Sequence, residues 1–176
     1  MSAAYRGNLP PDDRPDPGDN MDTKTVERRE LNFASLDEAL AEAERLAAGE
    51  VRTTGNHTFA QIIKHLALTH DMSSGKVVGP RLPWFMRLAM PLMRSKILNE
   101  PVKPGFKLPS KGETFFWPKD PGTVDQALAH LRESVEHYNQ KGPLPVHPIF
   151  GKATKEQVDG LNCKHCAMHL SFVHPV

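Results

Sequence analysis

Apolar residues recur every three or four positions in four separate stretches of the chain, a spacing that places them on one face of a helix. Residues 35–48 form the first stretch, and residues 123–139 form the third. The second stretch begins at Thr58 and the fourth at Thr154. Because polar residues occupy the opposite faces, the pattern predicts four amphipathic helices around one core.

Each predicted helix begins with a hydroxyl residue that is followed three positions later by Glu or Gln. In a capping box, the hydroxyl accepts a hydrogen bond from a first-turn amide, and the Glu or Gln side chain accepts one in return. A single pair is weak evidence, because these residue types are common, but four pairs aligned with helical patterns are hard to ascribe to chance. The pairs are Ser35/Glu38, Thr58/Gln61, Thr123/Gln126 and Thr154/Gln157.

The connections between these helices differ greatly in length. Fewer than ten residues separate the first helix from the second, whereas about fifty separate the second from the third, which permits a crossover. Within it, residues 83–98 predict an amphipathic helix kinked at Pro91. We expect this helix to pack across the others, with membrane-surface docking or a substrate lid as alternatives. Residues 101–121 predict a loop with a short β-hairpin near residues 114–117.

Composition and charge are those of one ordinary globular domain. The chain has 176 residues and a formal net charge of +1, which predicts no general attraction to nucleic acid or to an anionic membrane. No apolar run reaches the roughly 18 residues of a membrane-spanning helix. The first residues also lack the apolar segment of a secretory signal. The expected location is the cytoplasm, and the expected partner is a small molecule.

The N-terminal residues differ in composition from the rest. Residues 1–30 are dominated by Pro, Asp, Gly, Arg and Asn, which cannot bury enough apolar surface to offset the entropy of ordering. We therefore expect a disordered tail over residues 1–30 and one helical domain over residues 31–176. Met21 lies just before the composition changes, so translation that begins at Met21 is a further hypothesis.

Three histidines lie on the apolar faces of two predicted helices. His165 and His169 are four residues apart, so both point into the core from the fourth helix. His65 lies in a broad apolar arc of the second helix, whose opposite side carries Lys64 and Asp71. Three imidazoles from two facing helices can hold one divalent ion and leave a position for water or substrate. The alternative is that each imidazole bonds to a neighbouring carbonyl or carboxylate.

Two cysteines and one further histidine offer competing chemistry near this site. Cys163 and Cys166 have metal-site spacing, but on a regular helix both project away from the paired histidines, so we interpret them as reduced packing residues. Thiolate ligation is the alternative. His147 precedes Pro148 in a turn that leads into the fourth helix, and we interpret it as structural, with a role as a base behind the metal ligands as the alternative.

The remaining histidines have no partner at a helical spacing. His130 and His137 lie opposite the apolar stripe of the third helix and are expected to face solvent. His57, His70 and His174 are interpreted as packing or surface residues, although His70 could line the broad face of the second helix.

Several fragments of the chain together resemble a known superfamily. His65 on the second helix and the His165, His169 pair on the fourth match the metal positions of the DinB/YfiT-like superfamily of four-helix bundles. Residues 29–49, 55–67, 104–109, 147–151 and 165–170, in this order, look like a DinB-like subfamily of unknown function. The resemblance covers nearly all of residues 28–173. His57 departs from the tryptophan expected after Gly55 and Asn56.

The resemblance implies an all-α fold, an up-down-down-up four-helix bundle with a long crossover between helices two and three. Characterised relatives include thiol-dependent transferases and isomerases that use a metal to activate a low-molecular-weight thiol. We therefore expect a metal-dependent transferase or hydrolase in which a three-histidine site holds Zn²⁺, Ni²⁺ or Fe²⁺ and activates a thiol or water. The alternative is a non-catalytic metal sensor or interaction module. A homodimer that buries the apolar crossover is a further hypothesis.

Overall fold

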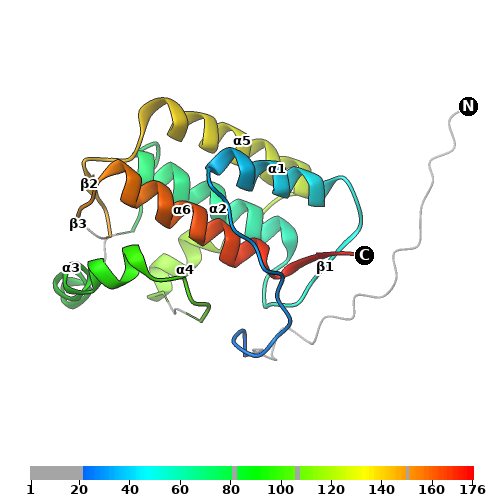
Figure 1. The fold of residues 1–176 in the computed structure, drawn as a ribbon, viewed down its shortest axis with the longest axis horizontal. Helices are drawn as coiled ribbons and strands as arrows, with labels where there is room; N and C mark the ends of the chain where they lie inside the picture. The colour runs from blue at the N-terminus through cyan, green and yellow to red at the C-terminus, as the bar shows by residue number, and fades with distance from the viewer. Residues whose placement is uncertain (1–21, 81–82, 106–107, 150) are drawn as a thin grey trace, which may run out of the picture.

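The computed structural model describes residues 22–80, 83–105, 108–149 and 151–176, and it is mainly α-helical (Figure 1). Four short strands accompany the helices in these residues. In chain order, the described elements are α1 (Leu36–Ala47), β1 (Val51–Thr53), α2 (Phe59–Ser74), α3 (Trp84–Asn99), α4 (Ser110–Phe116), α5 (Val124–Lys141), β2 (Val146–His147), β3 (Gly151–Lys152), α6 (Lys155–Leu170) and β4 (Val173–Pro175).

The four helices predicted from the apolar pattern are confirmed as α1, α2, α5 and α6. Thr58, Thr123 and Thr154 each form both hydrogen bonds of a capping box. At Ser35 the arrangement differs, because the side chain accepts from the Glu38 amide while Glu38 Oε2 accepts from the amide of Ala34, one residue earlier. The helix starts are therefore set by local side-chain chemistry.

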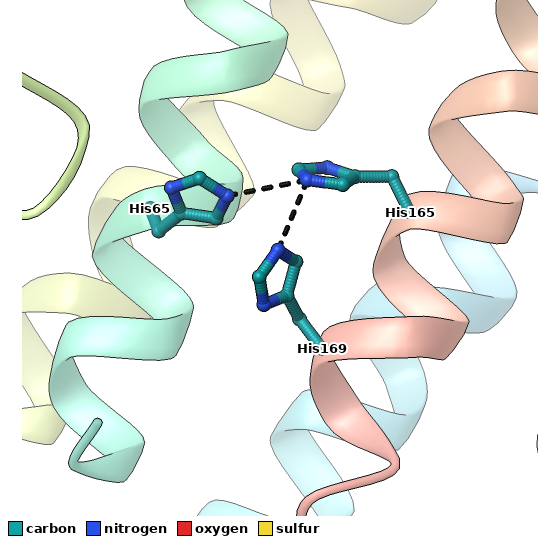
Figure 2. Close-up of side chains that lie close together, drawn as sticks. All are labelled: His65, His165 and His169. Carbon is teal, nitrogen blue, oxygen red and sulfur yellow. Dashed lines mark hydrogen bonds between the residues drawn. The ribbon is translucent and has the colours of Figure 1, made fainter. Parts of the chain in front are cut away.

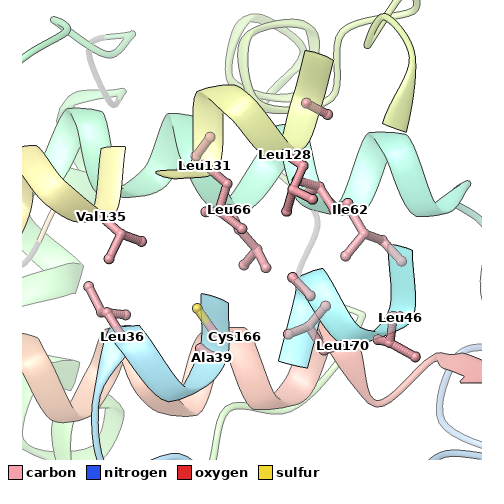
Figure 3. Close-up of a cluster of buried hydrophobic side chains, with 14 of the residues drawn as sticks. Leu36, Ala39, Leu46, Ile62, Leu66, Leu128, Leu131, Val135, Cys166 and Leu170 are labelled. Carbon is pink, nitrogen blue, oxygen red and sulfur yellow. The ribbon is translucent and has the colours of Figure 1, made fainter. Parts of the chain in front are cut away.

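An apolar core lies between α1, α2, α5 and α6 (Figure 3). Helix α2 packs along α5, and α1 contacts both α5 and α6, so that residues from all four helices meet in one cluster. Fully burying one leucine or isoleucine side chain stabilises the fold by about 1.5–3 kcal/mol. The core members labelled in Figure 3 are Leu36, Ala39, Leu46, Ile62, Leu66, Leu128, Leu131, Val135, Cys166 and Leu170.

A two-stranded antiparallel ribbon connects the end of α6 to the segment before α2. Strand β1 pairs with β4, and the Thr54 amide donates to the Phe172 carbonyl. A Cβ atom at Gly55 would lie 3.2 Å from the Phe172 ring, so a larger residue there would crowd this junction. The ribbon therefore holds the start of α2 beside the end of α6. Strands β2 and β3 form a separate small hairpin before α6.

Part of the predicted tail lies on the helical core. Residues 1–21, including Met21, are outside the described residues. In the described part, the Arg29 guanidinium pairs with Glu42 at 2.7 Å and donates to the Leu170 carbonyl. The Arg29 amide also donates to the Ser171 carbonyl. Arg29 thus connects this segment to both α1 and the end of α6.

The crossover between α2 and α5 contains two helices. The predicted helix over residues 83–98 is confirmed as α3, which contacts α6 through a hydrogen bond from Lys164 Nζ to the Leu98 carbonyl. The hairpin expected near residues 114–117 is wrong, because these residues belong to or adjoin α4, where burial of Phe116 secures the helix against the core. No helix in the described parts of the chain is long and apolar enough to cross a membrane.

Candidate metal centre

Helices α2 and α6 bring three imidazoles together, with their Nε2 atoms facing one another (Figure 2). His165 Nε2 lies 3.2 Å from His65 Nε2 and 3.0 Å from His169 Nε2. All three ligand atoms lie within 4.8 Å of one another. The three histidines singled out in the sequence therefore form one cluster.

The backbone explains why these side chains meet. His165 and His169 are one turn apart on α6, and side chains four residues apart on a helix lie above one another on the same face. His65 lies on α2, whose first turn is held beside the end of α6 by the β1–β4 ribbon. His65 is buried, whereas His165 and His169 are only partly buried, so solvent reaches one side of the cluster.

A backbone carbonyl determines which nitrogen of His65 carries the proton. His65 Nδ1 lies 3.2 Å from the Phe116 carbonyl oxygen. A carbonyl oxygen only accepts, so Nδ1–H must donate to it, and the lone pair is left on Nε2. Ligand histidines in metal sites commonly have this arrangement, because the bond orients the ring and raises its basicity.

An aromatic stack holds the same ring from its flat side. Trp117 lies between two imidazoles, with its ring centroid 4.0 Å from His65 and 3.5 Å from His57, and both pairs are nearly parallel. The Trp117 ring also contacts His169, with the two ring centroids 5.4 Å apart in an edge-to-face arrangement. His57, which has no helical spacing partner in the sequence, thus supports the histidine cluster through Trp117.

All three imidazoles are neutral near pH 7. Burial lowers the pKa of His165 to about 4. Burial also lowers the pKa of His65 and His169 well below the usual value, and the neighbouring imidazoles lower it further. A neutral imidazole keeps the lone pair that a metal ion requires.

The spacing of the nitrogens fits a small divalent ion. Four-coordinate zinc binds imidazole nitrogen at about 2.0–2.1 Å, which places two nitrogens of a tetrahedral site about 3.3 Å apart. The two Nε2 distances of 3.2 and 3.0 Å are close to that value. Neutral nitrogens this close repel one another unless a proton or a cation lies between them. The donor set therefore fits a divalent metal ion with a preference for nitrogen ligands.

The two cysteines are free, buried and outside this cluster. Burial raises the pKa of both the Cys163 and the Cys166 thiols, which favours the protonated form over a thiolate ligand. Cys166 Sγ lies 3.6 Å from His70 Nε2 on the neighbouring helix. These contacts support the interpretation of both cysteines as packing residues.

His147 also lies outside the cluster. It is buried in strand β2, and its Nδ1 accepts a hydrogen bond from the Ile149 amide at 3.2 Å. Because Nδ1 accepts, the neutral ring carries its proton on Nε2. Burial lowers the pKa of His147 to about 4. This bond supports the structural interpretation of His147 within its turn.

The expectation that His130 faces solvent is wrong. His130 Nε2 lies 2.7 Å from Asp71 Oδ2, and His130 Nδ1 lies 3.0 Å from Lys64 Nζ. Asp71 is only 1% exposed. The periodic pattern assigned these residues to polar helix faces, but it cannot show that the polar faces of α2 and α5 meet. His130 and His137 are both partly exposed, but it is His130 that bonds to Asp71.

Burial raises the pKa of Asp71, but the hydrogen bond from His130 and the positive charges nearby outweigh this effect. The net result is a pKa below the usual value. Lys76 Nζ lies 3.6 Å from Asp71 Oδ1 and supplies part of that charge. Asp71 is thus an anion held by neighbouring donors at neutral pH.

The two other histidines lie in the core and in the terminal strand. His70 is fully buried beside Cys166, which agrees with the expectation that it could line the broad apolar face of the second helix. His174 in β4 lies 3.5 Å from Thr54 Oγ1 and helps join the ribbon to the segment before α2. Neither residue contributes a ligand atom to the histidine cluster.

Comparisons with known proteins add a family relationship. A family model described as a protein of unknown function (DUF1569) matches residues 25–176. The match includes all three clustered histidines. No curated protein and no solved structure matches the chain.

Proposed function

The chain belongs to the DUF1569 family, whose function is unknown. We propose that it is a metal-dependent enzyme. In this proposal, His65, His165 and His169 hold one divalent ion, and the accessible side of the site takes a thiol or water. The observation that carries the proposal is the convergence of three neutral Nε2 atoms at distances of 3.0 and 3.2 Å.

We further propose that the domain has the DinB-like fold, an up-down-down-up bundle made of α1, α2, α5 and α6. Two features support this assignment. The histidines lie on the second and fourth of these helices, and the connection from α2 to α5 is long enough to contain both α3 and α4. A short connection would force α2 and α5 to be antiparallel neighbours, whereas a long one permits a parallel pair.

The residues around the metal would hold the ligand imidazoles in position and would not themselves react. The Phe116 carbonyl and the Trp117 ring fix the position and the tautomer of His65, so that Nε2 is ready to bind. His165 and His169, one turn apart, supply two ligands from one rigid element. When bound, the ion would act as a Lewis acid that lowers the pKa of a bound thiol or water.

Zinc is the favoured ion among Zn²⁺, Ni²⁺ and Fe²⁺. Imidazole suits all three metals, but two of the nitrogen spacings, 3.0 and 3.2 Å, match a tetrahedral site with one exchangeable position, which is the common arrangement of catalytic zinc. The proposed reaction class is group transfer from a low-molecular-weight thiol, or hydrolysis by an activated water.

The alternative is a non-catalytic metal sensor or interaction module. It is favoured by one observation, because His165 Nε2 lies within hydrogen-bonding distance of both other rings. If one imidazole were protonated, the three rings could satisfy one another without an ion. Metal content and metal-dependent activity separate these two functions.

Elemental analysis of protein purified without a nickel column tests the metal site. We expect about one divalent ion per chain in the wild type and almost none in His65→Ala or His169→Ala. His137→Ala is the matched control, because it removes a partly exposed imidazole outside the cluster. Unchanged metal content in both ligand variants would contradict the proposal.

A second assay tests catalysis. The metal-loaded protein would be screened for conjugation of small thiols to electrophiles and for hydrolysis of the same electrophiles. The enzyme proposal predicts activity that a chelator abolishes and added metal restores. Metal binding without any chelator-sensitive activity would favour the sensor.

A further inference from the structure

Large apolar side chains are exposed mainly in one part of the molecule. Among the described residues, seven such side chains are exposed, and five of them lie between residues 78 and 93. Trp84 is 73% exposed and Leu92 is 86% exposed. A concentration of this kind marks an interaction surface, whereas single exposed apolar residues are ordinary. The five residues are Val78, Trp84, Phe85, Leu92 and Met93.

Helix geometry places most of these residues on one side of α3. At about 100° per residue, Trp84, Leu92 and Phe85 lie within an arc of about 100°. Met90 is buried and lies on the opposite side of α3, and Leu98 is buried near the end of the helix, where Lys164 of α6 donates to its carbonyl. Helix α3 is thus attached by one face and exposes an apolar face, which we call the α3 outer face, made of Trp84, Phe85, Leu92, Met93 and Lys96.

The segment that contains α3 is strongly basic. Residues 76–111 contain eight Lys or Arg residues and one Glu, a net charge of +7 in a chain whose total is +1. The rest of the chain is therefore acidic. Lys96, Lys103 and Lys111 in this segment are exposed. A near-neutral total charge thus conceals one basic region that coincides with the exposed apolar residues.

We infer that the α3 outer face docks on the anionic lipid surface of a membrane, with the helix lying along the surface. Helices that bind in this way combine basic residues with Trp, Phe and Leu on one side. Tryptophan in particular prefers the boundary between water and lipid. The apolar side chains would enter the headgroup region, and the basic residues would attract anionic headgroups.

Charge also argues against two other occupants of this face. A second copy of the chain would bring two segments of net charge +7 together, and like charges across an interface oppose association. Nucleic acid would use the basic residues, but it gains little from exposed Leu92 and Met93 side chains. An anionic lipid surface makes use of both features. This inference does not depend on the metal proposal.

Co-sedimentation of the full chain with lipid vesicles tests the inference. We expect binding to vesicles that contain phosphatidylserine, and binding at least about tenfold weaker to vesicles of phosphatidylcholine alone. Added salt should weaken the binding to the anionic vesicles. Equal binding to both kinds of vesicle, or no binding to either, would overturn the inference.

Variants separate this face from nonspecific adhesion. Leu92→Glu and Phe85→Glu should each weaken binding to anionic vesicles about tenfold or more, and Lys96→Glu should weaken it by a smaller factor. Val146→Glu is the matched control, because Val146 is 58% exposed and lies outside α3. All four positions are exposed, and circular dichroism would verify folding. Wild-type binding by Leu92→Glu would contradict the inference.

Two further outcomes would assign the face to another occupant. A dimer in sedimentation equilibrium without lipid that Leu92→Glu dissociates would identify a second copy as the occupant. Binding to a DNA duplex that is tighter than binding to vesicles, and that Leu92→Glu leaves unchanged, would identify nucleic acid. Either result would overturn the lipid assignment.

Discussion

Two polar clusters involve helix α2, and they differ in how their hydrogen-bonding groups are matched. Toward α5, the Asp71 carboxylate is bonded to His130, which in turn lies 3.0 Å from the Lys64 ammonium. Toward α6, His65 donates to the Phe116 carbonyl, and its Nε2 faces His165 Nε2. In the first cluster an anion meets donors. In the second, nitrogens of the same kind face one another.

This difference separates a structural polar cluster from a ligand site. Buried polar groups are normally paired within the protein, and a network with matched donors and acceptors stabilises the fold. Three neutral imidazoles cannot match both contacts, because both contacts use His165 Nε2, which carries either one proton or one lone pair, and His65 Nε2 carries a lone pair. A divalent cation would satisfy all three nitrogens, as the metal proposal requires. Burial of histidines alone would not have distinguished the two regions.

The largest contrast is expected from His165→Ala. His165 Nε2 lies next to both other Nε2 atoms, so its removal should lower zinc affinity by more than about a hundredfold, beyond the loss typical of a residue that only supports a ligand. The free energy of unfolding of the metal-free protein should change by less than about 1 kcal/mol. Competition with a chromophoric chelator and urea unfolding in EDTA measure the two quantities. A zinc affinity within tenfold of wild type would contradict the assignment.

Asp71→Ala should lower the stability of the protein but leave its zinc affinity nearly unchanged. Removal of the buried carboxylate leaves the His130 Nε2–H donor without its partner and takes one of two carboxylates from Lys76, which should lower the free energy of unfolding by about 2–4 kcal/mol. Zinc affinity should change by less than about threefold, since no ligand is touched. The control Glu136→Ala, on the exposed side of α5, should change stability by at most about 0.5 kcal/mol. A large loss of zinc affinity with unchanged stability would reverse the roles of the two clusters.

Trp117→Leu tests the support of the metal site. Without the flat ring against His65, the imidazole should be less well oriented, and zinc affinity should fall about tenfold while binding remains at one ion per chain. Trp84→Leu changes the same residue type on the exposed face of α3 and should leave the affinity unchanged. Equal effects of the two substitutions would show that the stack does not position His65.

The smallest effect concerns pH and Asp71. Its pKa in the folded protein lies below the ordinary value of 3.8, so the folded state favours the ionised form more than the unfolded state does. The resulting stability is present above pH 3.8 and is lost as the pH falls through the folded pKa. The stability difference between wild type and Asp71→Asn should therefore narrow below about pH 4. Urea unfolding at several pH values measures it, and a difference that grows in acid would contradict this sign.

Local patterns predicted the helices and the histidine cluster because both depend on short-range spacing. Each helix start is set by a residue pair three positions apart, such as Thr154 and Gln157, and His165 and His169 are neighbours on one face. His65 has no histidine partner at this spacing on its own helix, but a histidine in an apolar arc must meet whatever packs against that arc. These features need no knowledge of the tertiary contacts.

The supporting contacts could not be predicted, because they join segments distant in sequence. Trp117 follows α4 and stacks between His57 and His65, and neither pair has a sequence spacing that indicates contact. The Asp71–His130 bond joins two helix faces that both read as polar. Polarity along one helix shows which face is hydrophilic, but not whether solvent or another hydrophilic face lies opposite.

X-ray absorption at the zinc edge of the zinc-loaded protein probes the three-histidine ligand set itself. We expect three imidazole nitrogens at about 2.0–2.1 Å and one further light atom that changes when a small thiol is added. The same spectrum of His65→Ala should lose one imidazole contribution. Sulfur ligands at about 2.3 Å in the absence of added thiol would identify Cys163 or Cys166 as ligands instead and would contradict the three-histidine site.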